Sequence, residues 1–188
     1  MSDLVLDKTS TSSVTGASLP AQTGTSSATE KMVREALEQV MDPEIRMLSV
    51  IDLGIIPEIV VDEENARITV SMTPTFSGCP AIHIMQDMIK SKIRETLPDY
   101  VIDVKVDFER QWSSNLITDK GREALKNFEL APPKKYEGEL DLETLKDAAC
   151  PRCGSHNTTM QSPFGPTLCR SIHFCFDCKQ SFQQFKPL

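Results

Sequence analysis

Two C-x-x-C units near the C-terminus constrain this 188-residue sequence more than any other feature. Cys150 and Cys153 form the first unit, Cys175 and Cys178 form the second, and 21 residues lie between them. Each unit fits a tight turn that directs two thiolates at one ion, and four thiolates complete a tetrahedral zinc site. The roughly 39 residues from Cys150 onward are too few for a hydrophobic core alone. The sequence therefore predicts a structural zinc, without which this segment unfolds.

The residues around these cysteines have the pattern of short strands. Residues 156–162 and 168–174 are expected to pair across the turn P-F-G-P, and residues 181–185 are expected to add a third strand. The segment is thus predicted to be an antiparallel zinc ribbon. An extended chain would place Cys169 roughly 20 Å from Cys175, too far to share one ion. Cys169 stays open as a second functional thiol, a ligand if the ribbon holds iron, or an inert small residue.

Changes in composition divide the chain into four parts. Residues 1–28 are rich in Ser, Thr, Gly and Ala and lack a hydrophobic period, so they are predicted to be a disordered tail. Residues 29–131 carry most of the apolar pattern, and residues 132–149 begin P-P-K-K and are predicted to be a linker. Residues 150–188 are the predicted ribbon.

The second part alternates between helical and strand periods. Apolar residues recur at helical spacing from Met32 to Val40 behind a predicted Thr29 cap, and again within 81–97 and 118–128. Ile- and Val-rich or alternating runs at 55–61, 66–72 and 100–108 predict three strands. This order predicts an α+β fold, a small sandwich of helices on a three-stranded sheet.

A lone cysteine, Cys79, lies where the second strand gives way to the 81–97 helix, in the stretch T-P-T-F-S-G-C-P-A-I-H. Gly78 permits a sharp turn and Pro80 suits a first helical position, so Cys79 is predicted at or beside the helix N-cap. Free amide groups and the helix dipole favour a thiolate there. The alternative is a small buried residue in a shaped loop. His83, one turn along, either assists the thiol or lies on the surface.

Composition also limits the location of the protein. No apolar run is long enough to span a membrane. The first residues, M-S-D-L-V-L-D-K, carry acids where a secretory signal carries positive charge. The sequence therefore predicts a cytoplasmic protein without a membrane partner. Because cytosolic reductants keep thiols free, its six cysteines are expected to serve metal or thiol chemistry.

Two further function classes are disfavoured by the sequence. The ribbon has four cationic side chains against Asp177 but no basic stripe or stacking array, which predicts no nucleic-acid partner. A thiol enzyme built on Cys79 and His83 would need an orienting third group and an oxyanion site, and the sequence locates neither. We therefore expect an accessory protein, not an enzyme.

Several motifs carry a resemblance to known families. D-P-E-I at 42–45, D-L-G at 52–54 and T-P-T-F-S-G-C-P-A at 73–81 resemble the SufT-like domain of iron-sulfur cluster maturation factors. With R-E-A-L, L-A-P-P, C-P-R-C-G-S, F-G-P-T-L-C and C-F-D-C, the chain resembles a narrower family, the D subunits of bacterial phenylacetyl-CoA epoxidase systems. The similarity covers nearly everything from about Thr29 to Pro187.

This resemblance implies accessory work in aerobic phenylacetate breakdown. The protein would assemble or deliver iron-sulfur clusters, with components of the epoxidase complex or its iron-sulfur reductase as partners. Cys79 would be the cluster-handling thiol, with Asp52, Thr73 and Thr75 around the same pocket, and a transient iron ion or cluster would be cargo beside the structural zinc. The alternative within the same pathway is a permanent electron-transfer or structural subunit with iron in the cysteine-rich segment.

Overall fold

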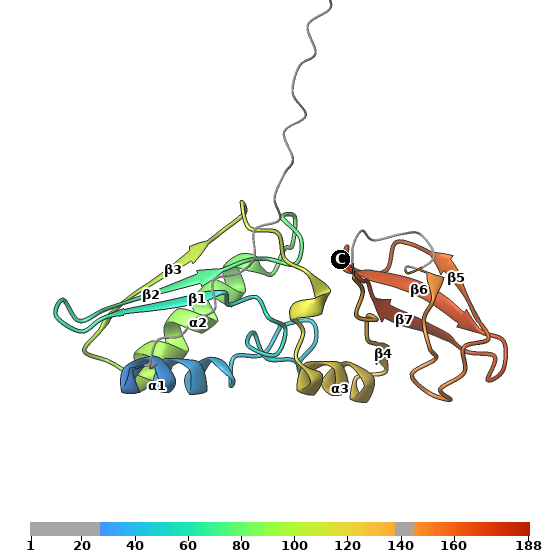
Figure 1. The fold of residues 1–188 in the computed structure, drawn as a ribbon, viewed down its shortest axis with the longest axis horizontal. Helices are drawn as coiled ribbons and strands as arrows, with labels where there is room; N and C mark the ends of the chain where they lie inside the picture. The colour runs from blue at the N-terminus through green and yellow to red at the C-terminus, as the bar shows by residue number, and fades with distance from the viewer. Residues whose placement is uncertain (1–26, 138–143, 145) are drawn as a thin grey trace, which may run out of the picture.

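The computed structural model describes residues 27–137, 144 and 146–188 (Figure 1). Most of the predicted tail and part of the predicted linker lie outside these residues. The helices are α1 (Ala28–Leu37), α2 (Ile82–Thr96), the 3-10 helix η1 (Ser114–Leu116) and α3 (Asp119–Asn127). The strands are β1 (Glu58–Asp62), β2 (Arg67–Met72), β3 (Val101–Val106), β4 (Leu130–Ala131), β5 (Thr158–Ser162), β6 (Arg170–Cys175) and β7 (Ser181–Phe185).

The first sheet has the order β1-β2-β3. β1 and β2 form the predicted antiparallel hairpin, with Glu58 opposite Ser71, while β2 and β3 are parallel, with Arg67 opposite Val101. The parallel pair needs a crossover, and α2 supplies it. α1 and α2 lie together on one face of this sheet, so the predicted α+β sandwich is confirmed (Figure 1).

The start of α1 differs from the sequence prediction. Ser27, not Thr29, is the N-cap residue, and its hydroxyl accepts a hydrogen bond from the Glu30 N–H at 3.1 Å. Thr29 already lies in the first helical turn. Ser27 has the extended backbone that a capping residue requires, so the earlier of the two hydroxyl residues forms the cap.

Two glycines fix α3 and η1 against the loop that contains D-L-G. Gly54 has a positive φ of 73°, and a Cβ there would lie 2.5 Å from the Leu116 carbonyl oxygen. A Cβ on Gly121 would lie 2.6 Å from the carbonyl oxygen of Asp52. Both positions therefore need glycine, because backbone lies where a side chain would begin.

The second sheet has the order β4-β7-β6-β5. β5, β6 and β7 form the predicted antiparallel ribbon. β4, directly after α3, adds an unpredicted parallel strand, with Leu130 opposite Gln183. A strand of two residues is too short to give an alternating pattern, so sequence periodicity does not reveal it.

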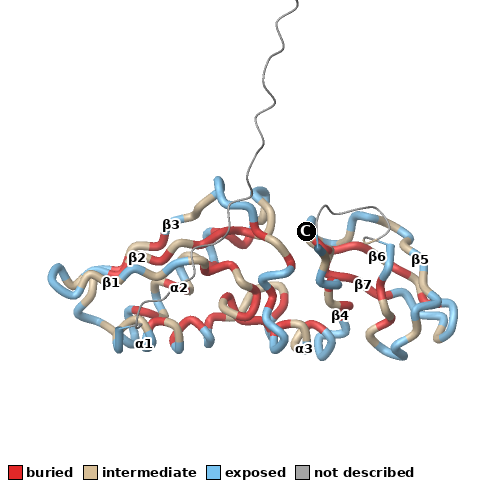
Figure 2. Tube along the Cα trace, in the orientation of Figure 1, coloured by how far each residue is buried: buried red, intermediate tan, exposed pale blue. Residues whose placement is uncertain are grey.

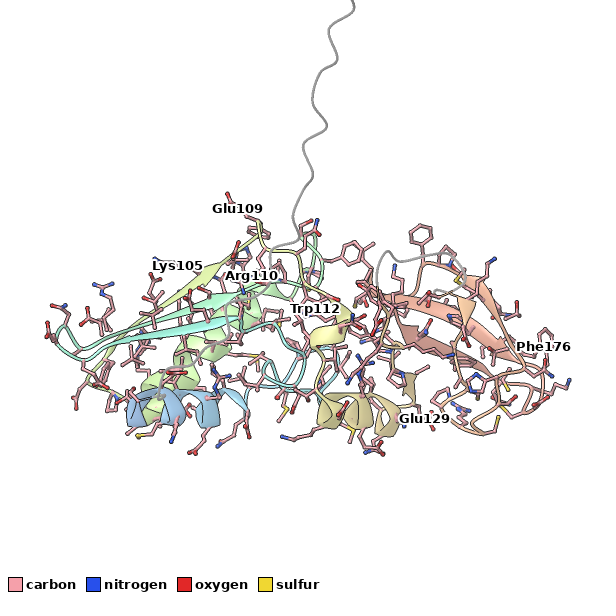
Figure 3. All side chains as sticks on the ribbon, viewed as in Figure 1. Lys105, Glu109, Arg110, Trp112, Glu129 and Phe176 are labelled. Atoms are coloured by element: carbon pink, nitrogen blue, oxygen red, sulfur yellow. The ribbon has the colours of Figure 1, made fainter. Side chains whose placement is uncertain are left out.

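The ribbon packs directly on the domain that contains the sheet β1-β2-β3, called the first domain below. Phe185 of β7 is 1% exposed and belongs to the hydrophobic core of that domain. It contacts Trp112, which is labelled in Figure 3. The indole N–H of Trp112 donates to the Leu53 carbonyl at 3.1 Å. The Ser114 N–H donates to the Leu188 carbonyl at 2.8 Å. Buried residues accordingly run through the first sheet and along β6 and β7 (Figure 2). Among the described residues, no helix is both long and apolar enough to cross a membrane.

Candidate functional site

Cys79 lies in the loop that joins β2 to α2. Its backbone N–H donates to the Phe76 carbonyl at 3.1 Å, and its own carbonyl accepts from the Ile82 N–H at 3.4 Å, so the chain turns just before the helix. α2 begins at Ile82 with Ala81 as its N-cap residue. Cys79 thus precedes the cap by two residues and is half-buried, close to its predicted position but outside the helix.

The surroundings of the Cys79 sulfur oppose ionisation. Burial raises the pKa of the Cys79 thiol, and a hydrogen bond from the Ala81 N–H lowers it by less. The nearby acidic groups Asp42, Cys169 and Glu44 raise it further. The raised pKa runs against the thiolate expected at the helix start, because burial outweighs the single amide that reaches the sulfur. Burial thus favours the neutral form of the Cys79 thiol.

Cys79 borders a small cavity between the first domain and the ribbon, with a volume of about 20 Å³. Its polar lining residues are Asp42, Glu44, Thr75, Cys79 and Cys169. Apolar side chains from both domains form the remainder: Ile45, Leu53, Ile55, Ala81, Met85 and Phe185. Thr75 and Cys79 therefore share one cavity. Sequence reasoning did not place Cys169 there.

Thr73 faces a different space. It is buried, with its N–H donating to the Ile55 carbonyl at 2.8 Å, and its hydroxyl has no hydrogen-bond partner among the described residues. It lines a separate cavity of about 440 Å³ together with Arg110 and Gln111. The structure thus does not bring Thr73 into the Cys79 cavity.

Asp52 is engaged in a local network instead. Its carboxylate accepts hydrogen bonds from the Ser49 and Thr118 hydroxyls, both at 2.8 Å, and pairs with Lys120 at 3.2 Å. Burial alone raises the pKa of the Asp52 carboxyl, but the three donors together outweigh it and lower that pKa. Thr118 also caps α3 through the Gly121 N–H. Asp52 therefore ties the D-L-G loop to α3.

His83 lies on the exposed side of α2. Its Nδ1 is 3.2 Å from Oε1 of Gln86, and it does not line the Cys79 cavity. Within the described part of the chain, no other histidine lines that cavity either. The surface alternative for His83 is thus the one that the geometry supports.

The four ribbon cysteines converge on one point. Their sulfurs all lie within 4.8 Å of one another, with Cys150 Sγ 3.7 Å from Cys178 Sγ and Cys153 Sγ 3.6 Å from Cys175 Sγ. A tetrahedral ion with Zn–S bonds of about 2.3 Å would separate its sulfurs by about 3.8 Å. The donor set and its spacing therefore fit a single tetrathiolate zinc ion. Larger separations would be needed for an iron-sulfur cluster, in which several iron atoms lie between the cysteines.

The backbone of each C-x-x-C unit is folded into a tight turn. The residue after each second cysteine has a positive φ, 73° at Gly154 and 59° at Lys179. The Gly154 N–H donates to the Cys150 carbonyl at 2.9 Å, and the Cys175 N–H donates to the Gln180 carbonyl at 2.9 Å. A hydrogen bond from the Cys178 N–H is the main cause that lowers the pKa of the Cys175 thiol, to about 7. These turns aim both sulfur pairs at the same site.

Comparison with known proteins divides the chain in the same way. Residues 30–107 match a family described as iron-sulfur cluster assembly protein, and residues 136–186 match the PaaD zinc beta ribbon domain. The fold and the cysteine sites thus define a class of protein in which a cluster-assembly domain is followed by a zinc ribbon.

Three curated relatives show which family within this class the chain belongs to. The chain is 31% identical, over 80% of its length and 88% of the relative, to the D subunit of the putative 1,2-phenylacetyl-CoA epoxidase of Escherichia coli (strain K12). It is 28% identical to an Fe-S protein maturation auxiliary factor of Porphyromonas gingivalis, over 49% of this chain and 86% of that one. It is 33% identical to the Fe-S protein maturation auxiliary factor YitW of Bacillus subtilis, over 38% and 68%. The chain belongs to the family of the epoxidase D subunits.

Proposed function

We propose that this protein is an accessory factor that assembles or delivers iron-sulfur clusters for a phenylacetyl-CoA epoxidase system. Two relatives, which match 49% and 38% of the chain, are named maturation auxiliary factors, and the relative that matches 80% of it is named as part of an epoxidase. The epoxidase components, or the iron-sulfur reductase among them, are the proposed clients.

The observation that carries this proposal is the position of Cys79. Cys79 belongs to the domain that matches the assembly family, and it is half-buried at the cavity between that domain and the ribbon, with Asp42 and Glu44 in the same lining. A thiol that borders carboxylates suits transient metal binding, because a metal ion displaces the thiol proton on its own.

The roles of the other site residues follow from their contacts. We assign Thr75 to the wall of the cavity that Cys79 also lines. We assign Asp52 to positioning, since it joins the loop at 49–54 to Thr118. We assign Thr73 to the wall of the separate cavity, and its hydroxyl is buried without a hydrogen-bond partner among the described residues. The tetrathiolate zinc holds the ribbon folded against the first domain.

Substitution of Cys79 tests the proposal in cells. The client reductase is co-expressed with the wild-type chain, with Cys79→Ser, or with His83→Ala as the matched control one turn away. Iron and acid-labile sulfide per reductase are then measured. We expect both to fall several-fold with Cys79→Ser and to stay at the wild-type level with His83→Ala. Equal cluster content with Cys79→Ser and wild type would refute the proposed role.

The electron-transfer alternative is tested on the wild-type chain itself, purified from the same cells. A colourless protein with one zinc per chain after anaerobic purification is expected. Iron bound in stoichiometric amount by the ribbon, with sulfur-to-iron charge-transfer bands, would instead make the chain an electron carrier. The sulfur separations in the ribbon favour the zinc assignment because they match a single ion.

A further inference from the structure

We infer that Cys79 and Cys169 together bind one soft divalent metal ion in the cavity between the two domains. This inference deepens the proposed function and rests on it, since it names the cargo and the second thiol of the same site. Cys79 comes from the assembly domain and Cys169 from the ribbon, so the site exists only where the domains meet.

The two cysteines are brought together by direct packing of their loops. A Cβ on Gly78, the neighbour of Cys79, would lie 3.7 Å from Cδ1 of Leu168, the neighbour of Cys169. The carbonyl of Cys169 accepts from the Lys186 N–H at 2.9 Å, which fixes this loop to the end of β7. The anchored Phe185 precedes Lys186 directly and packs in the first domain. The same contact that joins the domains therefore positions the second sulfur.

The size of the cavity selects the cargo. A volume of about 20 Å³ suffices for one water-sized particle. A two-iron or four-iron cluster is far larger than one water molecule and does not fit while the domains stay packed. A single ion does fit, and thiolate ligands favour soft ions such as iron in its sulfur sites, or zinc.

The charges around the cavity are balanced for such an ion. Asp42 and Glu44 supply two negative charges, and Arg170 and Lys186 supply two positive ones within electrostatic reach of Cys169. Arg170 also lies 3.8 Å from Glu44. Binding releases one proton from each thiol to solvent, so that a divalent ion and two thiolates together are neutral. The ion thus adds no net charge to a partly buried site.

A site with only two thiol ligands suits the transfer of its metal ion to a client protein. Within the described part of the chain, the ribbon tetrad is the one group with three or more donor side chains already within 4.8 Å of one another. The junction site offers two cysteines that line one cavity, and two thiols leave coordination positions open. A closed set of four ligands is typical of structural sites, whereas an open position admits an incoming ligand. Ligands from the client would complete the coordination and draw the ion away.

Anaerobic iron binding to the full-length, zinc-loaded chain tests this site, with ferrous salt alone as the probe. We expect one iron ion per chain in addition to one zinc. Cys79→Ser and Cys169→Ser should each weaken iron binding roughly tenfold or more, as the loss of a ligand requires, with zinc unchanged. His83→Ala is the control and should bind iron as the wild type does. Absence of extra iron in the wild type, or full affinity in Cys169→Ser, would overturn the two-thiol site.

A labelling experiment uses the wild-type protein alone, so its result does not depend on whether a variant folds. Wild-type protein is alkylated with and without ferrous ion, and each cysteine is followed by mass spectrometry. Protection of both Cys79 and Cys169 by iron supports the shared site, and protection of Cys79 alone overturns it.

The failure of this inference is distinguishable from failure of the proposed function. If client clusters are lost with Cys79→Ser but not with Cys169→Ser, the two-thiol site is wrong and the proposed function stands. If client clusters survive Cys79→Ser while iron still needs both thiols, the metal site stands and the proposed function is wrong.

Discussion

The ribbon tetrad and the Cys79–Cys169 cavity are both thiol sites, but they differ in how complete they are before an ion arrives. The tetrad gathers four sulfurs at metal-binding separation on turns of a single small sheet. The cavity has two sulfurs, one from each domain, with two carboxylates beside them. A complete set of four ligands stabilises a fold, whereas an incomplete set leaves positions at which another ligand can bind the ion and remove it.

The contrast also shows where each site obtains its stability. The tetrad depends on local turns, so zinc and the ribbon fold together. The cavity depends on the docking of Phe185 and Leu188 against the first domain. The Cys79–Cys169 cavity therefore depends on the tetrad, because only a folded ribbon brings Cys169 to the first domain.

The largest effect is expected from breaking the tetrad. Cys153→Ser should abolish zinc binding and unfold β5 to β7, since a structural zinc of this kind contributes on the order of 10 kcal/mol. Zinc analysis and hydrogen exchange of the ribbon amides measure this directly. Cys169→Ser is the matched control, from the turn just before β6, and should retain one zinc. Persistent protection of β6 amides in a zinc-free variant would contradict the structural role.

The next effect is expected from separating the two domains. Phe185→Ala removes a fully buried aromatic side chain and should cost about 3–5 kcal/mol in the free energy of unfolding. Urea denaturation measures the loss. Phe176→Ala, at an exposed aromatic position of the ribbon (Figure 3), should cost less than about 1 kcal/mol. Equal losses for the two variants would show that Phe185 does not join the domains.

A smaller effect tests whether Asp52 is a positioning residue. Thr118→Ala removes both the cap of α3 and a hydrogen bond to Asp52, and should destabilise the fold by about 1–2 kcal/mol. Thr118→Ser keeps the hydroxyl and should recover most of this loss. Thermal unfolding provides the comparison. A severe loss of client clusters in a stably folded Thr118→Ala protein would instead place this network in the functional site.

The smallest effect concerns the reactivity of the Cys79 thiol. Its pKa is raised, chiefly by burial, so the thiolate fraction is low at pH 7 and grows as pH rises. The alkylation rate at Cys79 in zinc-loaded, iron-free protein should be a few-fold below that of an unfolded cysteine peptide at pH 7 and should still increase above pH 9. A rate that levels off below pH 8 would indicate a lowered pKa and restore the thiolate interpretation.

Sequence patterns reveal what is decided locally. The two C-x-x-C units predict the tetrad because each turn spans only four residues, and the stripe from Ile82 to Ile93 predicts α2 because helical period is a local property. The loop sequence places Cys79 within two residues of the helix cap for the same reason.

What depends on tertiary contact is not predictable in this way. Cys169 lies 90 residues from Cys79 in the sequence, and its approach depends on how Phe185 docks, which leaves no periodic signal. The same holds for the raised pKa of Cys79, since burial by the ribbon is invisible in the loop sequence. The motif F-G-P-T-L-C is the available signal, but it marks Cys169 without locating its partner.

The central claim is that Cys79 handles the metal cargo while the tetrad only holds the ribbon. Transfer from purified, iron-loaded protein to apo-reductase, with sulfide and a one-electron oxidant supplied, tests it most directly. The account predicts cluster formation on the reductase with the wild-type chain and almost none with Cys79→Ser, while both proteins retain one zinc per chain. Transfer by Cys79→Ser at the wild-type rate would contradict it.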